Sequence, residues 1–249
     1  MESNIKIIFE NQDFLIISKP AGLLVHTPRV ISNSQFPISN EFSIAQWIKQ
    51  NYPGITIVGD EPIIRPGIVH RLDKETSGIM VIAKNQNAFE VLKDKFKNRE
   101  VKKTYLALVL GKMNQASGVI NLPIAKSKTS TKRTTKIRPG QKNSQALTEW
   151  KLLKTFKEKS NNFLSLLELT PRTGRTHQIR VHLAAISHPV CGDYLYGRKA
   201  TKSFRQDLPR IFLHAKSLEF LWDKSLYSFE AELPLELKGF LASLVEINE

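Results

Sequence analysis

The chain has 249 residues, of which 41% are hydrophobic and 24% charged, enough for one sizeable globular core. Its 37 Lys and Arg outnumber 23 Asp and Glu, and the formal net charge of +14 points to a polyanionic partner. The single cysteine, Cys191, excludes an intrachain disulfide and a zinc site built on cysteines. Because no apolar run approaches the roughly 20 residues of a transmembrane helix, we expect a soluble, cytoplasmic protein without a membrane partner.

The first half of the chain alternates short apolar runs with turn residues. Residues 5–9 and 14–17 predict two strands paired as a hairpin, and the spacing at 44–48 predicts a helix capped by Ser43. Residues 51–69 are punctuated by Pro and Gly and predict loop. The apolar run 79–83 then predicts a buried strand, followed by a helix with apolar residues at helical spacing over 89–96.

The second half continues the same mixture. Strands are predicted at 104–110 and 163–169, and a helix at 177–187 with Thr176 as its N-cap. Further strands within 212–220 and at 227–233 precede a last short helix near 235–245. Since there is no internal repeat and no long linker, we expect a single α+β domain that spans residues 1–249.

One segment, residues 126–142, is unusually basic. It holds seven Lys or Arg and no Asp or Glu, and its Ser and Thr offer little to a core, so we expect an exposed loop. Clustered positive charges repel one another unless phosphates neutralise them, which favours a nucleic-acid contact. A solvated loop with no partner is the alternative.

The commoner catalytic signatures are absent. The sequence contains neither a Gly-x-x-x-x-Gly-Lys phosphate loop nor Gly-x-Gly-x-x-Gly, nor the paired cysteines of a zinc deaminase. What remains is the stretch RPGIVHRLDKETSG at 65–78, which leads directly into the predicted strand at Ile79. It places Asp73 on a tight loop before a core strand, where its carboxylate would be firmly held. Taken alone, an aspartate there more often caps a turn with Thr76 and Ser77.

The full stretch closely resembles the catalytic motif of the RluA-like pseudouridine synthases. Further segments resemble motifs of the same family in the same order: KPAGLLVH at 19–26, KTYLALVLG at 103–111, TGRTHQIRVHL at 173–183, GDYLYG at 192–197 and LHA at 213–215. Together they cover roughly residues 5 to 245. The resemblance implies the fold of this family, a central mixed, largely antiparallel sheet flanked by helices and loops.

The resemblance also implies residue roles. Asp73 would be the nucleophile, Tyr105 would pack against the target base or assist its deprotonation, and Arg175 would pair with Asp73. Arg71 would enter the RNA stack vacated by the flipped base. Breaking the N1–C1′ bond of uridine and joining C5 to C1′ involves no redox change or group donor, so neither cofactor nor metal is expected. The remaining RNA-binding candidates are His70, Lys19, Lys126, Lys128, Lys132, Arg133, His177 and Arg180.

The family resemblance leaves the target open. Stand-alone members act on ribosomal or transfer RNA, and we expect this chain to lack the small N-terminal RNA-binding domain of larger members and to be a monomer. A non-catalytic RNA-binding or assembly protein that keeps the fold is the main alternative. A basic hydrolase that releases free uracil is a third.

Overall fold

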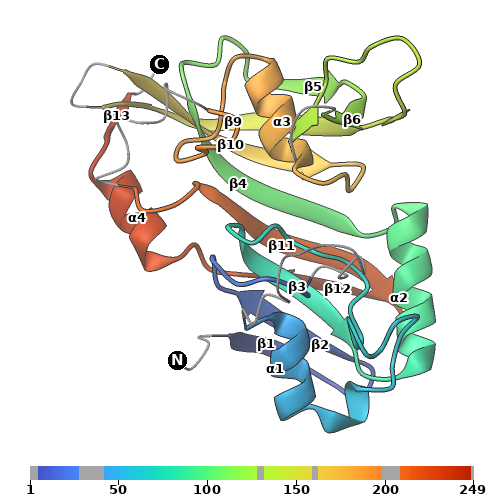
Figure 1. Ribbon diagram of the computed structural model, residues 1–249. Helices are drawn as coiled ribbons and strands as arrows, with labels where there is room; N and C mark the ends of the chain where they lie inside the picture. The colour runs from blue at the N-terminus through green and yellow to red at the C-terminus, as the bar shows by residue number, and fades with distance from the viewer. Residues whose placement is uncertain (1–4, 28–41, 128–131, 159–161, 198–207, 248–249) are drawn as a thin grey trace. The chain divides into compact units, whose positions relative to one another are not determined.

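The computed structural model describes residues 5–27, 42–127, 132–158, 162–197 and 208–247, and these form the predicted α+β fold (Figure 1). The chain folds into two compact units. The first comprises residues 1–101 and 217–231, and the second comprises 102–216 and 232–249. That the two units act as the single domain expected from the sequence stays a prediction.

The sheet of the first unit has the strand order β1-β2-β3-β11, with β12 beside β11. Strands β1 (Lys6–Glu10) and β2 (Phe14–Lys19) form the predicted antiparallel hairpin, and β2 continues antiparallel to β3 (Ser77–Ala83). Every residue of β3 is buried, as its unbroken apolar sequence predicts. Strands β11 (Leu213–Trp222) and β12 (Ser225–Glu230) are antiparallel, and β12 ends before the predicted boundary at residue 233.

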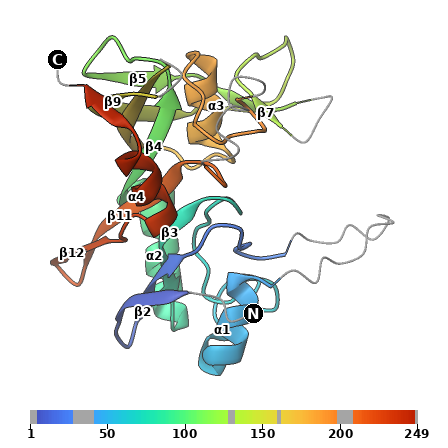
Figure 2. The same ribbon diagram turned by 90° about the vertical axis from the view of Figure 1, so that its left-hand side faces the viewer.

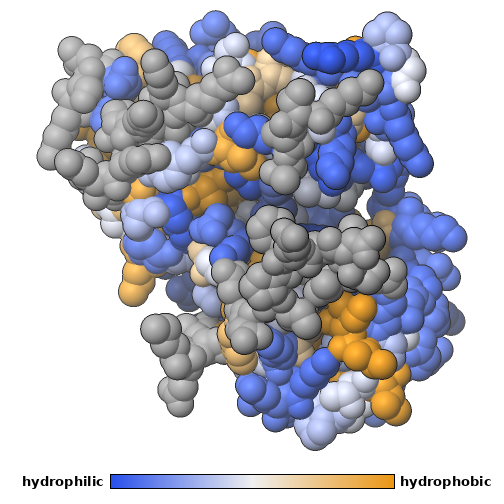
Figure 3. Space-filling model, viewed as in Figure 1, coloured by the Kyte–Doolittle hydropathy of each residue, from blue (hydrophilic) through white to orange (hydrophobic). Residues whose placement is uncertain are grey.

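The helices of the first unit also match expectation (Figure 2). Helix α1 (Ile44–Asn51) begins after Ser43, whose hydroxyl accepts the Gln46 N–H, and a short 3-10 turn, η1 (Pro53–Ile55), follows. Helix α2 (Gln86–Asn98) packs on β3 and exposes a hydrophilic surface (Figure 3). No helix in the described ranges is long and apolar enough to cross a membrane.

The same 10-stranded sheet continues from β11 in the order β4-β10-β9-β13, with β5 beside β9. These strands are β4 (Lys102–Leu110), β5 (Ser117–Asn121), β9 (Leu147–Lys157), β10 (Phe163–Pro171) and β13 (Val245–Ile247), and the pairs β10–β4, β10–β9, β5–β9 and β13–β9 are antiparallel. The last helix, α4 (Leu235–Ala242), is shorter than predicted because the chain turns back after it to add β13 to β9.

A second, three-stranded sheet corrects the view of the basic segment as plain loop. Strand β6 (Ile124–Lys126) pairs with β7 (Arg133–Thr134) and β8 (Asn143–Ser144). The buried residues Ile124 and Ala146 anchor this sheet beside Val181 of helix α3 (Gln178–Ala185). Buried apolar residues on either side of the basic segment thus hold it against α3, which its high charge did not predict.

The main core of the second unit lies between helix α3 and the sheet. Its buried members come from β4, β5, β9, β10, α3 and β11 and include Ala107, Val109, Ile120, Trp150, Leu167, Leu169, Ile179, Leu183 and Leu213. Helix α3 packs on β9 and β10, so the sequence just before it is fixed against the sheet.

Candidate active site

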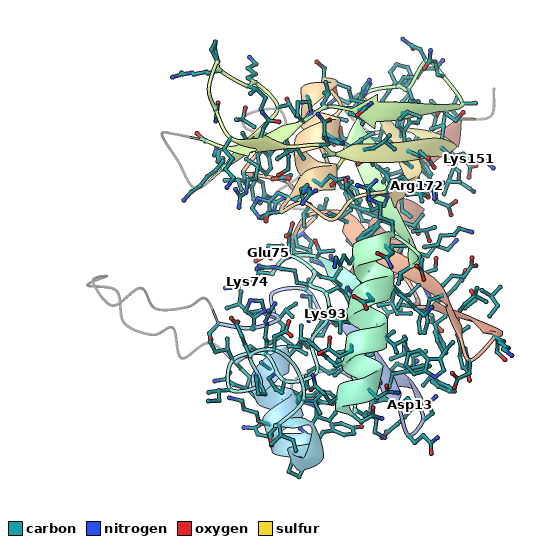
Figure 4. The ribbon with its side chains drawn as sticks, turned by 90° about the vertical axis from the view of Figure 1, so that its right-hand side faces the viewer. Asp13, Lys74, Glu75, Lys93, Lys151 and Arg172 are labelled. Atoms are coloured by element: carbon teal, nitrogen blue, oxygen red, sulfur yellow. The ribbon has the colours of Figure 1, made fainter. Side chains whose placement is uncertain are left out.

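The loop that carries Asp73 is fixed at both ends. Gly67 has a φ of 65°, and a Cβ there would overlap the Ala83 carbonyl oxygen, so only glycine allows this approach to β3. At the other end the Asp73 carbonyl accepts the Thr76 N–H at 3.1 Å, and β3 begins at the next residue. The Asp73 side chain is half-buried, and Lys74 and Glu75 follow it on the same loop (Figure 4).

Lys19 is hydrogen-bonded to this loop. Its side chain is fully buried, and its Nζ donates to the carbonyls of Pro20 (2.8 Å), Leu23 (2.8 Å) and Lys74 (3.0 Å). An ammonium has three N–H donors, and these hydrogen bonds use all of them. Lys19 thus links the first motif to the residue after Asp73, and its expected contact with RNA stays a prediction.

His70 and Arg71, adjacent in sequence, differ in environment. The His70 ring stacks on Phe96 of α2 with centroids 4.5 Å apart, and its Nε2 accepts the Val81 N–H at 3.1 Å. These two contacts hold the loop between α2 and β3, and the RNA contact expected of His70 stays a prediction. Arg71 is exposed and keeps its predicted role as a proposal.

Tyr105 and Arg175 belong to the second unit, whereas Asp73 belongs to the first, so their pairing stays a prediction. Tyr105 lies on β4 opposite Leu169 and packs partly buried against the main core. Arg175 is exposed in the turn before α3, where its backbone N–H donates to Gln178 Oε1 at 3.1 Å and its Nε donates to the Gln145 carbonyl at 3.3 Å.

Arg180 is a structural cation in the same motif. Its guanidinium donates to both carboxylate oxygens of Asp193 at 2.7 and 2.9 Å and lies 5.2 Å from the centre of the Tyr196 ring. Asp193, 1% exposed, also accepts the N–H groups of Leu195 and Tyr196. The bidentate pair and the aromatic ring hold the buried Arg180 side chain, and its expected role in RNA binding stays a prediction.

His177 and the basic segment meet at Tyr196. The Tyr196 hydroxyl accepts the backbone N–H of Arg133 at 2.9 Å and lies 2.9 Å from His177 Nδ1. Lys132 Nζ donates to the Leu195 carbonyl at 2.8 Å. The side chains of Lys132 and His177 therefore have partners within the protein, and Arg133 is held through its backbone N–H. Lys126 is exposed, and Lys128 lies outside the described residues.

Comparison with known proteins assigns the family. A family model described as RNA pseudouridylate synthase matches residues 13–185, which include Asp73, Tyr105 and Arg175. This span covers more than half of the chain and confirms the resemblance seen in the motifs.

The chain belongs to the RNA pseudouridylate synthase family. It is 39% identical over 79% of its length to an uncharacterized RNA pseudouridine synthase of Aquifex aeolicus and 34% identical over 98% to the ribosomal large subunit pseudouridine synthase D of Borreliella burgdorferi. It spans 57% and 70% of the length of these two relatives. Among solved structures, the human RNA pseudouridylate synthase domain containing 1 matches with a TM-score of 0.76 at 26% identity, covering 98% of this chain and 89% of that one.

One buried polar residue that the sequence pattern did not single out, Gln178, positions Arg175. Gln178 Oε1 accepts both the Thr173 hydroxyl and the Arg175 N–H, while its Nε2 donates to the Leu147 carbonyl and the Thr148 hydroxyl oxygen. This network replaces the predicted Thr176 cap: the N-cap is His177, with a φ of 56° and no side-chain cap. The available signal was a glutamine among the apolar residues of the predicted helix, where a buried polar side chain needs hydrogen-bond partners.

A second buried polar residue fastens α3 to the sheet. His182 is fully buried, with Nε2 at 2.9 Å from the Leu122 carbonyl and Nδ1 at 2.9 Å from the Thr148 hydroxyl. Since the carbonyl only accepts, Nε2 carries the proton and Nδ1 accepts from Thr148. Burial lowers the pKa of His182, which favours this neutral form. The histidine therefore has a structural role within the second unit.

Proposed function

We propose that this protein isomerises specific uridines of ribosomal RNA to pseudouridine, with Asp73 as the nucleophile. The observation that carries the proposal is the similarity to two proteins named ribosomal large subunit pseudouridine synthase D, at 34% and 36% identity over 98% and 96% of this chain. The fixed loop around Asp73 supports it, because a nucleophile must be held within a fraction of an ångström of its productive geometry.

The chemistry that we propose balances within one nucleotide. The N1–C1′ bond of uridine breaks, the uracil turns, and C5 bonds to C1′; the proton leaves C5 and N1 takes up a proton. The Asp73 carboxylate acts on this sequence either by adding covalently or by stabilising the cationic sugar carbon. Tyr105 assists removal of the C5 proton, and Arg175 orients the Asp73 carboxylate.

Release of tritium from RNA labelled at C5 of uridine tests the proposal. We expect the wild-type protein to release label from large-subunit ribosomal RNA and the Asp73→Asn variant to release none above background. Glu75→Gln is the matched control, since it neutralises an exposed carboxylate two residues further along the same loop and should retain activity.

The alternatives predict different products. If the protein binds RNA but releases no tritium from either ribosomal or transfer RNA, it would be a non-catalytic RNA-binding or assembly protein. Appearance of free uracil would identify a hydrolase. Release from transfer RNA alone would keep the chemistry but reject the ribosomal substrate.

A further inference from the structure

A small cluster of basic side chains in the first unit has unmet hydrogen-bonding capacity. His26 ends the first motif, and Arg65 lies in the turn before the Asp73 loop. Burial lowers the pKa of His26, and the charges of Arg71 and Arg65 lower it further, while Glu61 opposes them. Both guanidinium groups are therefore close enough to the imidazole to act on it electrostatically.

Unpartnered buried atoms concentrate in this cluster. Within the described ranges, three buried side-chain nitrogen or oxygen atoms have no hydrogen-bond partner: His26 Nδ1, Arg65 Nε and Arg133 Nε. Two of the three belong to the cluster. Arg65 Nε lies 3.3 Å from Glu61 Oε2, but the alignment makes an ion pair without a hydrogen bond.

The missing partner is an acceptor. A guanidinium Nε only donates, and an imidazole Nδ1 donates when it is protonated, so an anion with several oxygens can satisfy both atoms. Two guanidinium groups against the single carboxylate of Glu61 repel a cation. The two nitrogen atoms are buried, but the Arg65 side chain as a whole is 37% exposed and His26 is half-buried, so both residues reach the surface.

The cluster lies beside the Asp73 loop within the same unit. The backbone N–H of Gly22 donates to the Lys74 carbonyl at 2.9 Å, and Lys19 links that carbonyl to Leu23. The segment that ends at His26 is therefore joined, through Gly22 and Leu23, to the residue that follows Asp73. Arg71 precedes Asp73 by two residues.

We propose that His26 and Arg65 bind one internucleotide phosphate of the RNA, next to the uridine on which Asp73 acts. The proposal rests on the proposed function for the identity of the anion. Phosphate is the anionic group that every nucleotide of RNA supplies, and arginine binds it through paired N–H donors. Because the phosphate charge opposes the two guanidinium charges, binding also raises the pKa of His26 and favours its doubly protonated, donating form.

Nuclear magnetic resonance of the imidazole nitrogens tests the anion site directly. The full chain labelled with ¹⁵N is titrated with pH alone, with inorganic phosphate, and with a mixed-sequence, uridine-containing RNA dodecamer. We expect the pKa of His26 to rise from below about 6.5 towards or above that value with both ligands. His182, which is fully buried in the second unit and has its pKa lowered by that burial, is the internal control and should not respond to either ligand.

The two ligands separate the sources of the effect. A rise with inorganic phosphate but none with RNA would show an adventitious ion only and would overturn the proposal. An unchanged His26 pKa with both ligands would overturn it as well.

A double-mutant cycle on affinity for the same RNA dodecamer tests whether the two residues share one phosphate. We expect His26→Gln and Arg65→Gln each to raise Kd about fivefold, and the double variant to raise it by about fivefold to tenfold, well below the product. Lys154→Gln removes one exposed, ion-paired charge in the second unit and should change Kd less than about twofold.

The shared phosphate would be overturned if the single variants leave Kd unchanged. It would also be overturned if the Kd increase of the double variant equals the product of the two single increases. Unchanged unfolding midpoints would establish that the variants are folded; if His26→Gln fails to fold, the pKa titration of the wild-type protein still decides. Tritium release is scored separately. A wild-type protein that shows the coupling but releases no label rejects the proposed function, whereas an active protein without coupling rejects only the phosphate site.

Discussion

Lys19 in the first unit and Arg180 in the second are both buried cations, yet the two units satisfy them differently. Lys19 donates to three backbone carbonyls that lie on two separate segments, so it acts as a joint between loops. Arg180 faces a buried carboxylate, Asp193, which in turn accepts two backbone N–H groups. The charge of Lys19 is met by carbonyl dipoles from two segments of the chain, whereas the charge of Arg180 is met by the single carboxylate of Asp193.

This difference affects how each site should respond to mutation. Removing Arg180 leaves a full negative charge buried, which costs far more than an unmet dipole. Removing Lys19 leaves carbonyl oxygens, some of which reach water when the loop relaxes. Exposed cations such as Arg71 and Lys126 carry neither cost and remain available to phosphates.

The largest effect is expected from Arg180→Met. We expect the free energy of unfolding to fall by about 3–5 kcal/mol, because Asp193 would keep its charge without its partner. Urea unfolding measures this change. Arg172→Met is the matched control: Arg172 forms the same pair of hydrogen bonds with Glu149, but the side chains are 52% and 39% exposed, and we expect a loss below about 1 kcal/mol.

The experiment compares the losses in free energy of unfolding for the buried and the exposed arginine. Equal losses from Arg180→Met and Arg172→Met would show that burial does not set the strength of the pair. A further variant with Arg180→Met and Asp193→Leu together should recover part of the loss, since the buried charge is then gone.

A smaller effect is expected from Lys19→Met. Loss of three hydrogen bonds should lower the free energy of unfolding by about 2–3 kcal/mol. The Lys74 carbonyl next to Asp73 loses a donor, so we also expect kcat for tritium release to fall about tenfold or more, with the Kd for RNA unchanged within about twofold. Lys84→Met is the control, since Lys84 is only partly buried and pairs with Glu10.

The split between kcat and Kd separates the two roles of Lys19. An increase in Kd with kcat retained would support Lys19 as an RNA-binding residue and contradict its role in linking the first motif to the Asp73 loop. Loss of stability with both kinetic quantities retained would limit Lys19 to a purely structural part.

Much of the fold follows from local pattern. The unbroken apolar run of β3 and the Ser43 cap of α1 are signals that neighbouring residues carry themselves. Strands β5, β9 and β13 and the three-stranded sheet of β6, β7 and β8 were not predicted from the sequence. Charged residues interrupt the apolar pattern of β9, while β13 and the strands of the small sheet have only two or three residues each.

The candidate site divides in the same way. Resemblance to the family motifs selected Asp73, Tyr105 and Arg175, because the motifs are recognised from residue types alone. Which cations of a motif are buried could not be predicted from the sequence, because Lys19 and Arg180 have the same charge as the exposed Arg71. Their partners, the Lys74 carbonyl and Asp193, lie 55 and 13 residues away in sequence, so no local pattern announces them.

The smallest effect on stability is expected in the basic segment, where exposed and engaged cations lie side by side. Lys136→Gln and Arg138→Gln alter exposed side chains, so the free energy of unfolding should change by less than about 0.5 kcal/mol. If these side chains neutralise RNA phosphates, the slope of log Kd against log salt should fall by about 0.7 for each phosphate that is no longer neutralised. Lys132→Gln provides the comparison, because Lys132 Nζ is already engaged by the Leu195 carbonyl and its removal should leave the slope unchanged. An equal slope change in all three variants would mean that engagement within the protein does not withdraw a cation from RNA, and the distinction drawn for Lys19 and Arg180 would then depend on their depth alone.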